Sequence, residues 1–313
     1  YWNTGTCKIS IKDRFERRIN MFPAGFDKEG IMYSITAYGD FPIKLPAKKR
    51  DHRTGASTGW MLLSYKKPVI VSSFEDCANV ETHRVDNGGK KVIEKICYDA
   101  QNITDEDIQT YWSARTSQAG EWLQLDLGEK MEIRALQINY ADHKATQYNK
   151  AMDMYHQYQI FMSDDAKSWT LVVDKSKNDR DVPHDYVELT KPIRARYVKM
   201  VNIHCASGLF AISDFRVFGH GLSEKPSRVE RFTVNRASSD SRNAMITWDT
   251  QKKAVGYTIY YGIAPDKLYN NIMVYDVNFY DFRGLDKGTT YYFAIEAFNS
   301  NGVGPLTEVL KVD

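Results

Sequence analysis

The chain has 313 residues, of which 42% are hydrophobic and 26% charged, and its formal net charge is +2. This length suggests two or three domains, and this composition excludes an intrinsically disordered chain. The small net charge argues against nucleic acid or an anionic membrane surface as the main partner. No run of 18 apolar residues occurs, so we expect no membrane-spanning helix.

Proline-marked joints divide the sequence into three segments, residues 1–67, 68–221 and 222–313. Apolar residues alternate with polar ones in short runs, which is typical of antiparallel strands, so we predict an all-β chain of sandwiches. Residues 145–156 lack this alternation, and we expect a long loop or a short helix there. The clearest alternation is Leu123, Leu125, Leu127, then Leu136, Ile138, Tyr140, then Tyr158, Ile160, Met162.

The first segment carries a hairpin signal, in which residues 27–30 form a turn between two strands. Residues 17–42, joined with residues 59–65, resemble the last blade of the five-bladed propeller of glycoside hydrolase family 43-like proteins, and we interpret residues 1–67 as the end of such a propeller. One blade cannot close a propeller, and the resemblance implies that the catalytic base belongs to an earlier blade. We therefore predict no catalytic residue, and we expect turn or solvent roles for Asp27, Glu29 and Asp40. Because Tyr1 opens in mid-pattern, we expect a fragment or a processed chain.

The four cysteines contain no C-x-x-C pair, which argues against zinc and redox motifs. Cys77 and Cys97 are twenty residues apart and suit a disulfide in an oxidising compartment. Two buried free thiols are the other interpretation of this pair.

The second segment resembles a discoidin (coagulation factor 5/8 type C) domain of the branch called family 32 carbohydrate-binding modules. The resemblance implies a jelly-roll-like β-sandwich whose loops at one end bind ligand. The matching stretches are residues 102–113, 121–128, 158–169, 195–199 and 213–219.

A polar loop in this segment predicts a structural Ca²⁺ site. Asp105, Asp107 and Thr110 lie within six residues and present the hard oxygen ligands that calcium prefers. In the family such a loop binds calcium with backbone carbonyls and a carboxylate from the closing strand, a position matched by Asp214. Glu106 stands where the family has glycine. An acidic turn that caps a strand is the alternative interpretation.

The predicted sugar contacts come from the loops of the same segment, because sugar sites combine an aromatic face with a few hydrogen-bonding groups. Ser113 stands where family members often have histidine, and His143 where they often have arginine. An aromatic on the last loop matches the family. The candidates are Asp142, His143, Asn202, His204 and Phe210.

The third segment resembles a fibronectin type III domain over nearly all of its length. Residues 246–248 match the buried tryptophan strand, residues 257–262 the central strand, and residues 285–299 the stretch with the tyrosine corner. Tyr291 is expected to hydrogen-bond back to the loop before it. The resemblance specifies a fold and predicts a spacer or adhesive role.

Together these features predict a non-catalytic carbohydrate-binding and spacer region of an extracytoplasmic glycoside hydrolase. The expected partners are a poly- or oligosaccharide and a preceding catalytic propeller in cis. Two alternatives remain open: the modules complete the active site of a family 43-like glycosidase, or both are structural spacers at a cell surface. The polar loop of residues 178–186 would suit docking against a neighbouring domain.

Overall fold

The computed structural model describes residues 24–34, 36–38, 41–43, 58–85, 87–107, 109–145 and 154–313. Within this part the chain is almost entirely β-structure, as the alternation predicted, with one short 3-10 turn, η1 (Ala100–Ile103). No described helix is long and apolar enough to cross a membrane. The chain divides into a central unit, residues 62–219, and a C-terminal unit, which joins residues 220–313 to the described part of residues 20–61.

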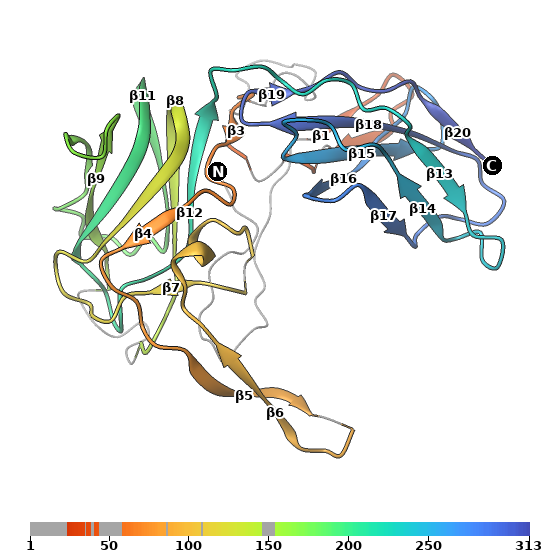
Figure 1. Cartoon of the computed structure of the whole chain (residues 1–313). Coiled ribbons are helices and arrows are strands. Elements are labelled where there is room, and N and C mark those ends of the chain that lie inside the picture. Colours follow the sequence, from red (N-terminus) through yellow and green to blue (C-terminus); the bar gives the residue numbers. More distant parts are fainter. Residues whose placement is uncertain are drawn as a thin grey trace. The chain divides into compact units, whose positions relative to one another are not determined.

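The central unit contains an eight-stranded sheet and a separate two-stranded hairpin (Figure 1). Residues 146–153 of the loop predicted at 145–156 lie outside the described residues. The strands are β3 (Met61–Leu62), β4 (Val69–Val71), β5 (Ala78–Val85), β6 (Lys91–Ile96), β7 (Trp112–Ser113), β8 (Trp122–Tyr140), β9 (Gln157–Ser163), β10 (Thr170–Asp174), β11 (His184–His204) and β12 (Ala211–His220).

The long strands β8 and β11 form one antiparallel ribbon whose two halves belong to different layers. Pairing runs from Val201 opposite Trp122 to His184 opposite Asn139, and the register is irregular near the middle of both strands. Along β11, only residues 197–204 pair with β9, and along β8, only the first half pairs with β4. β12 lies beside the second half of β8, so the sheet folds into a two-layered sandwich.

The core between these layers comes from the predicted alternation. Leu123, Leu125 and Leu127 on β8 have no exposed surface, and Ile160 on β9 and Phe215 on β12 pack into the same cluster. Burying each such side chain contributes roughly 1.5–3 kcal/mol. The period-two prediction for this segment is therefore confirmed.

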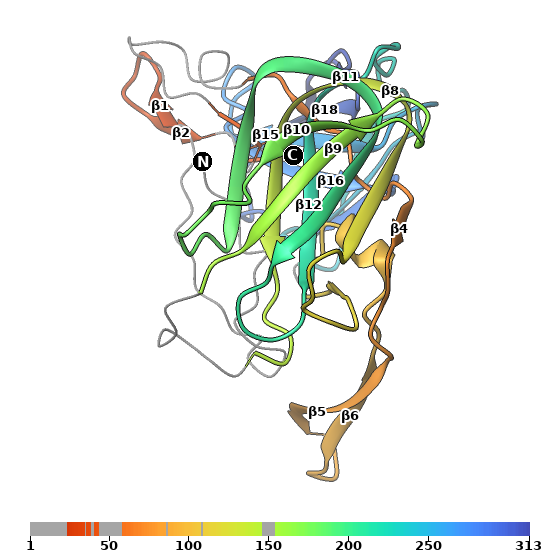
Figure 2. The ribbon, with the colours of Figure 1, turned by 90° about the vertical axis from the view of Figure 1, so that its left-hand side faces the viewer.

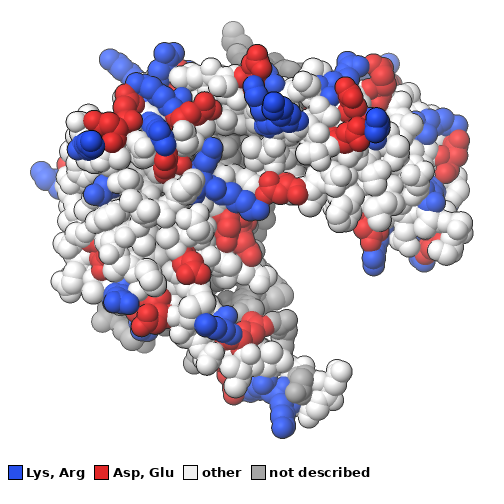
Figure 3. Space-filling model, in the orientation of Figure 1, with Lys and Arg blue, Asp and Glu red and all other residues white. Residues whose placement is uncertain are grey.

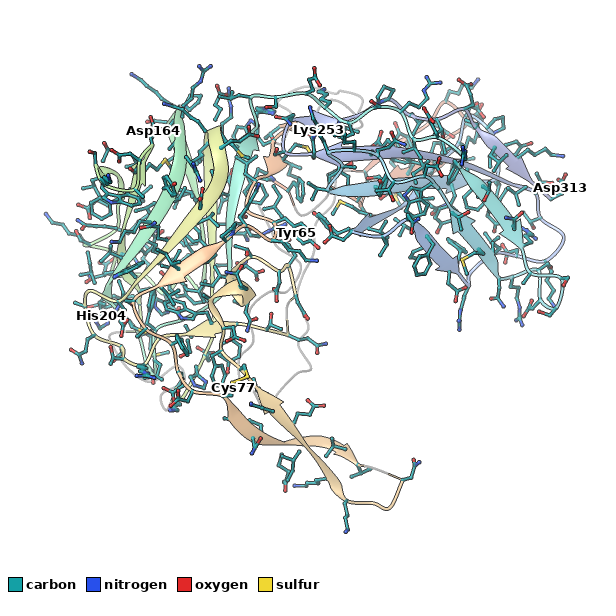
Figure 4. The ribbon with its side chains drawn as sticks, viewed as in Figure 1. Tyr65, Cys77, Asp164, His204, Lys253 and Asp313 are labelled. Carbon is teal, nitrogen blue, oxygen red and sulfur yellow. A yellow bond between two sulfur atoms is a disulfide. The ribbon has the colours of Figure 1, made fainter. Side chains whose placement is uncertain are left out.

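The hairpin β5–β6 leaves the sandwich of the central unit as an arm (Figures 1 and 2). A disulfide between Cys77 and Cys97 closes the base of the arm (Figure 4). Of the two interpretations of this pair, a disulfide or two free thiols, the disulfide is therefore the one that the structure contains. An isolated two-stranded hairpin is marginally stable in water, and the disulfide shortens the loop that must be ordered. Cys205 is a buried free thiol.

The C-terminal unit contains the two facing sheets of a second sandwich, one of three strands and one of five. Its buried cluster includes Trp248, Tyr291, Phe293, Ile295 and Ala297, as the sequence predicted. The strands are β13 (Thr233–Arg236), β14 (Ala244–Thr247), β15 (Gly256–Gly262), β16 (Asn270–Tyr275), β17 (Phe279–Phe282), β18 (Tyr291–Asn299), β19 (Gly302–Val303) and β20 (Leu310–Val312).

The predicted tyrosine corner is present in this unit. The hydroxyl of Tyr291 donates to Asp286 Oδ2 at 3.0 Å and accepts from the backbone N–H of Asp286 at 3.4 Å. The side chain thereby pins the loop before β18 to the strand, as corner tyrosines do in sandwiches of this kind.

The hairpin predicted in the first segment is also present, as β1 (Ala24–Phe26) and β2 (Met32–Ser34) joined by a turn. Asp27 shapes this turn, because its Oδ1 accepts hydrogen bonds from the backbone N–H groups of Glu29 and Ile31. The hairpin and the turn after it pack on the outer face of β16, β15 and β18. Asn271 Oδ1, for example, accepts from the backbone N–H of Ala37 at 2.6 Å. Asp40 lies outside the described residues.

Candidate functional site

The loops of the central unit gather at one end of its sandwich because the bent ribbon brings both termini of β8 and of β11 back to that end. Tyr158, near the start of β9, donates to Asp185 Oδ2, near the start of β11, at 2.7 Å. The backbone of Ala114 bonds to that of Phe210, joining two of the loops. We call this region, which comprises residues 72–77, 112–121, 141–145, 154–156, 175–183 and 205–210, the loop end.

All five predicted sugar contacts lie at the loop end or on the strand termini beside it, but they differ in exposure. Phe210 has no exposed surface and packs edge-on against the ring of Trp112, with centroids 5.4 Å apart. Asn202 is 1% exposed, and its Nδ2 donates to the carbonyls of Ser117 and Gln118. Both side chains therefore anchor loops from inside, and as sugar contacts they stay predictions.

His143 lies in a small aromatic cluster beneath the loops. Its Nδ1 is 3.0 Å from the hydroxyl of Tyr111, and its ring centroid is 4.4 Å from that of Tyr98. Burial lowers the pKa of His143, and neighbouring Lys144 lowers it further. The imidazole is therefore neutral at neutral pH, and it packs against the rings of Tyr98 and Tyr111.

Asp142 and His204 are the two predicted contacts that keep half-buried, solvent-facing positions. Figure 4 labels His204 at the loop end and Asp164 at the opposite end of the same unit. The ring of Tyr155 lies beside that of His204, with centroids 4.8 Å apart. This pair offers an aromatic and polar surface of the kind that a sugar ring contacts.

Buried polar atoms without hydrogen-bond partners also gather around the end of β8. Tyr140 stacks on His156 with 3.6 Å between centroids, yet neither Tyr140 Oη nor His156 Nδ1 meets a partner in the described part of the chain. The same holds for Nδ2 of Asn139 and Nε2 of His143. Native proteins rarely leave such atoms unpaired, so this cluster suits ordered water or a hydroxyl-rich ligand nearby. Burial lowers the pKa of His156 to about 3, so this ring is neutral as well.

The sequence analysis missed two residues of the loop end, Phe74 and Arg115. Phe74 is 52% exposed, and the guanidinium of Arg115 lies 5.9 Å from the centre of its ring. Arg115 Nε also donates to the carbonyl of Phe74 at 3.0 Å. Arg115 lies two residues after a matching stretch and Phe74 well before the first one, and the only signal in the sequence was an aromatic residue in a polar run.

The predicted calcium loop is folded on its own hydrogen bonds. Thr110 Oγ1 donates to Asp105 Oδ2 at 2.6 Å, and the other oxygen of Asp105 accepts from the backbone N–H of Asp107. The carboxylate of Asp107 accepts from the backbone N–H of Gln109. The structure therefore brings Asp105 and Thr110 together, whereas Asp107 caps the turn.

Asp214 lies beneath this loop on β12 with no exposed surface. Neither of its carboxylate oxygens has a hydrogen-bond partner among the described residues. Burial raises the pKa of Asp214 well above its ordinary value, and the charges of Glu106 and Asp105 raise it further. A buried carboxylate with two unpaired oxygens beside other acids is the donor set that a hard cation satisfies.

Glu106 occupies the position where the resemblance implies glycine, and it adopts the positive φ that glycine favours, +58°. Its carboxylate is held by Arg216, with Nε to Oε1 and Nη2 to Oε2 both at 3.0 Å. The backbone at residue 106 thus keeps the left-handed conformation that glycine favours. The ion pair with Arg216 offsets part of the acidic charge of the loop. No three Asp, Glu, His or Cys side chains converge in the described part of the chain, so a cation here would also need backbone carbonyls.

Comparison with known proteins agrees with two of the resemblances. Residues 87–213 match the family model of the F5/8 type C domain, and residues 225–313 match that of the fibronectin type III domain. No curated protein matches the sequence.

Similar solved structures include three bacterial modules. One is CpGH89CBM32-6 from Clostridium perfringens, which is 18% identical, covers 50% of this chain and 98% of its own, and has a TM-score of 0.35. Chitosan-binding module 1 from a Paenibacillus sp. IK-5 chitosanase/glucanase is 19% identical, covers 51% and 99%, and has a TM-score of 0.37. The family 32 module of C. perfringens NanJ, solved with galactose, is 16% identical, covers 51% and 100%, and has a TM-score of 0.37.

Proposed function

We propose that the central unit is a carbohydrate-binding module that holds a poly- or oligosaccharide at its loop end. The observation that carries the proposal is the gathering of half-exposed rings and buried unpaired polar atoms at the end of β8, within a stretch that matches the F5/8 type C family. Sugar sites need an aromatic face and a small number of hydrogen-bonding groups, and this end of the sandwich supplies both.

The charge of the loop end favours a neutral ligand over an anion. His143 and His156 are both neutral, and Lys144 is paired with Glu75. Arg115 interacts with Asp76 at 3.4 Å. Acidic and basic side chains are interspersed over the visible surface, with no field of one sign (Figure 3). Hydroxyl groups of a glycan therefore fit better here than a phosphate or a nucleic acid.

Glycan-array binding by the full chain tests this function, with a matched pair of substitutions. Asp142→Asn at the loop end is expected to weaken binding at least fivefold, because it replaces a solvent-facing acceptor. Asp164→Asn, the same change at the opposite end, is expected to leave binding unchanged. His204→Ala should weaken binding like Asp142→Asn. Absence of binding to any glycan, or equal binding by all three variants, would contradict the proposal.

We further propose that the loop of residues 104–110 binds Ca²⁺ as a structural ion. Asp214 and Asp105 would supply carboxylate oxygens and Thr110 a hydroxyl, with the remaining ligands coming from backbone carbonyls. The unpaired oxygens of Asp214 support this assignment. An ion bound only by the folded state raises stability by mass action.

Melting of the chain with EDTA and with added CaCl₂ tests the ion. Calcium is expected to raise the melting temperature of the central unit and to leave that of the C-terminal unit unchanged. Asp214→Asn should abolish this response while keeping the volume of the side chain. If EDTA and calcium leave the wild-type melting curve unchanged, the loop is only an acidic turn.

The wider setting that we propose is an extracytoplasmic glycoside hydrolase, in which the two sandwiches target or brace a family 43-like propeller. The resemblance of residues 17–42 to a propeller blade and the disulfide of the arm support this setting. Joining this chain to such a propeller should increase hydrolysis of an insoluble glycan relative to the propeller alone. An increase on soluble substrate as well would favour modules that complete the active site, and no increase on either would favour a spacer.

A further inference from the structure

A cavity of about 560 Å³ lies in the C-terminal unit, between the β1–β2 hairpin and the outer face of β15 and β18. Nothing in the proposed carbohydrate site involves this cavity. Its size is within the range of small-molecule sites, which commonly combine apolar walls with a few polar groups. The lining residues are Tyr33, Tyr260, Pro265, Asp266, Leu268, Tyr269, Glu296, Leu306 and Val309.

The walls of the cavity are aromatic and are held in place by contacts on their outer sides. Tyr33 on β2 stacks on Tyr269 with centroids 4.8 Å apart and planes inclined by 22°. The hydroxyl of Tyr269 donates to Asp27 Oδ2 at 2.9 Å, which fixes the ring from the hairpin turn. Leu306 and Val309 are 38% and 40% exposed and form a rim open to solvent.

Glu296 supplies the charged group of the cavity. Its Oε1 accepts a hydrogen bond from Tyr260 at 2.7 Å and a longer one from Tyr38 at 3.5 Å. Its Oε2 accepts no hydrogen bond from the described residues. One carboxylate oxygen is therefore available on a side chain that lines the cavity.

The charged side chains that line the cavity in the described part of the chain are acidic. No Lys, Arg or His is among its described lining residues, whereas Glu296 and Asp266 are both acidic. The nearby Lys267 is engaged in the hairpin turn, with its Nζ 3.4 Å from Asp27 and 2.9 Å from Glu29. Burial raises the pKa of Glu296 to about 7, and only tyrosine hydroxyls oppose this increase.

We propose that this cavity binds the ammonium group of an organic cation, with the group against Glu296 and the apolar body between Tyr33, Tyr260 and Tyr269. Charge complementarity selects this ligand class, because a carboxylate and aromatic rings that line the same cavity attract a cation through both the charge and the ring faces. A neutral ligand of the same shape would gain only the apolar contacts. The inference is independent of glycan binding by the central unit.

Benzylamine and benzyl alcohol provide the test, since at pH 8 the first is a cation and the second is a neutral molecule of nearly the same shape. Calorimetry and amide chemical shifts of the full chain are expected to show benzylamine binding with shifts in β15 and β18. Benzyl alcohol is expected to bind at least tenfold more weakly. Failure of benzylamine to bind, or equal affinity for the alcohol, would overturn the proposal without any variant.

Two substitutions then locate the site. Glu296→Gln keeps an acceptor for Tyr260 but removes the charge, and is expected to weaken benzylamine binding at least tenfold. Glu308→Gln removes the same charge from a side chain that is 92% exposed and outside the cavity lining, and should change binding less than twofold. Tyr33→Leu should weaken binding severalfold through loss of a ring face. Equal affinities of the two Gln variants would overturn the proposed role of Glu296.

Discussion

The central and C-terminal units are both β-sandwiches with apolar cores, yet they place their unusual polar groups differently. In the central unit the unpaired atoms of Tyr140, His143 and His156 lie at the loop end. In the C-terminal unit the carboxyl of Glu296, whose pKa burial raises to about 7, lies on the outer face of a sheet beneath a hairpin. The difference teaches that a sandwich fold does not specify where recognition occurs, because loops and covered faces can both form sites.

This contrast has a physical basis in how each sheet ends. The bent ribbon β8–β11 returns its termini to one end, so several loops meet there and shield polar atoms from water. At the tyrosine corner of the C-terminal unit, by contrast, the hydroxyl of Tyr291 has hydrogen-bond partners within the unit, namely the backbone N–H and the carboxylate of Asp286.

The largest expected effect tests how firmly the loop end is tied to the core. Phe210→Ala removes a fully buried ring packed on Trp112 and is expected to destabilise the central unit by about 3–5 kcal/mol. Phe74→Ala, the same change at a ring that is 52% exposed, should cost less than about 1 kcal/mol. Denaturant unfolding followed for each unit checks this, and similar costs for the two variants would mean that Phe210 is not an anchor.

The disulfide provides the next test, on whether the arm is an independent part of the central unit. Replacing Cys77 and Cys97 together by serine removes the closure of a twenty-residue loop, worth roughly 3 kcal/mol in the chain-entropy treatment. Hydrogen exchange is expected to accelerate in β5 and β6 and to stay unchanged in β8 and β11. Faster exchange throughout the sandwich would show that the arm stabilises the whole unit.

Glu296 gives a pH test of the covered face. Its pKa is raised to about 7 in the folded chain from 4.5, so the folded state holds the proton more tightly than the unfolded state. Its contribution to stability is therefore full below pH 4.5 and is lost as pH rises through 7, by on the order of 1–3 kcal/mol. Glu296→Gln should remove this decline.

Melting of the C-terminal unit between pH 5 and 8 measures the difference between the wild type and Glu296→Gln. A difference that does not change with pH would show that Glu296 titrates normally. The comparison with the variant is needed because other titratable groups lie around this carboxyl, namely Tyr33, Tyr38, Tyr260, Asp266 and Tyr269.

The smallest expected effect concerns the satisfied corner of the C-terminal unit. Tyr291→Phe deletes a hydroxyl that bonds to Asp286 and should cost about 1 kcal/mol. Tyr292→Phe, at the half-buried neighbouring position, should cost less, since no hydrogen bond of its hydroxyl is present among the described contacts. Equilibrium unfolding of both variants measures the difference. Equal costs would remove the contrast between a satisfied corner and an unsatisfied loop end.

Much of both folds could be predicted from local patterns. Leu123, Leu125 and Leu127 alternate with polar residues and are all buried, because side chains of a strand point to opposite faces in turn. The turn at residues 27–30 and the corner at Tyr291 could also be predicted from the sequence, since each depends on contacts between residues that are close in the chain. For the same reason the polar loop of residues 104–110 could be located as a cluster of oxygen-bearing side chains.

The candidate sites were less readable, because exposure depends on packing between distant segments. Phe210 and Asn202 were candidate sugar contacts, and the structure buries both beneath residues far away in sequence. The ion pair of Glu106 with Arg216 could not be foreseen either, because the two residues are 110 positions apart in the chain. The cavity at Glu296 could not be foreseen, since Tyr33 and Glu296 come from opposite ends of the chain.

The sequence by itself determined the strands, their buried faces and the two sandwich folds, because hydrophobic periodicity and short-range turn chemistry act over a few residues. Only the tertiary structure decided which polar groups are left unpaired at the loop end, which oxygen of Glu296 stays available, and that Cys77 meets Cys97. The physical reason is that burial and charge act through space, between residues that the chain order keeps apart.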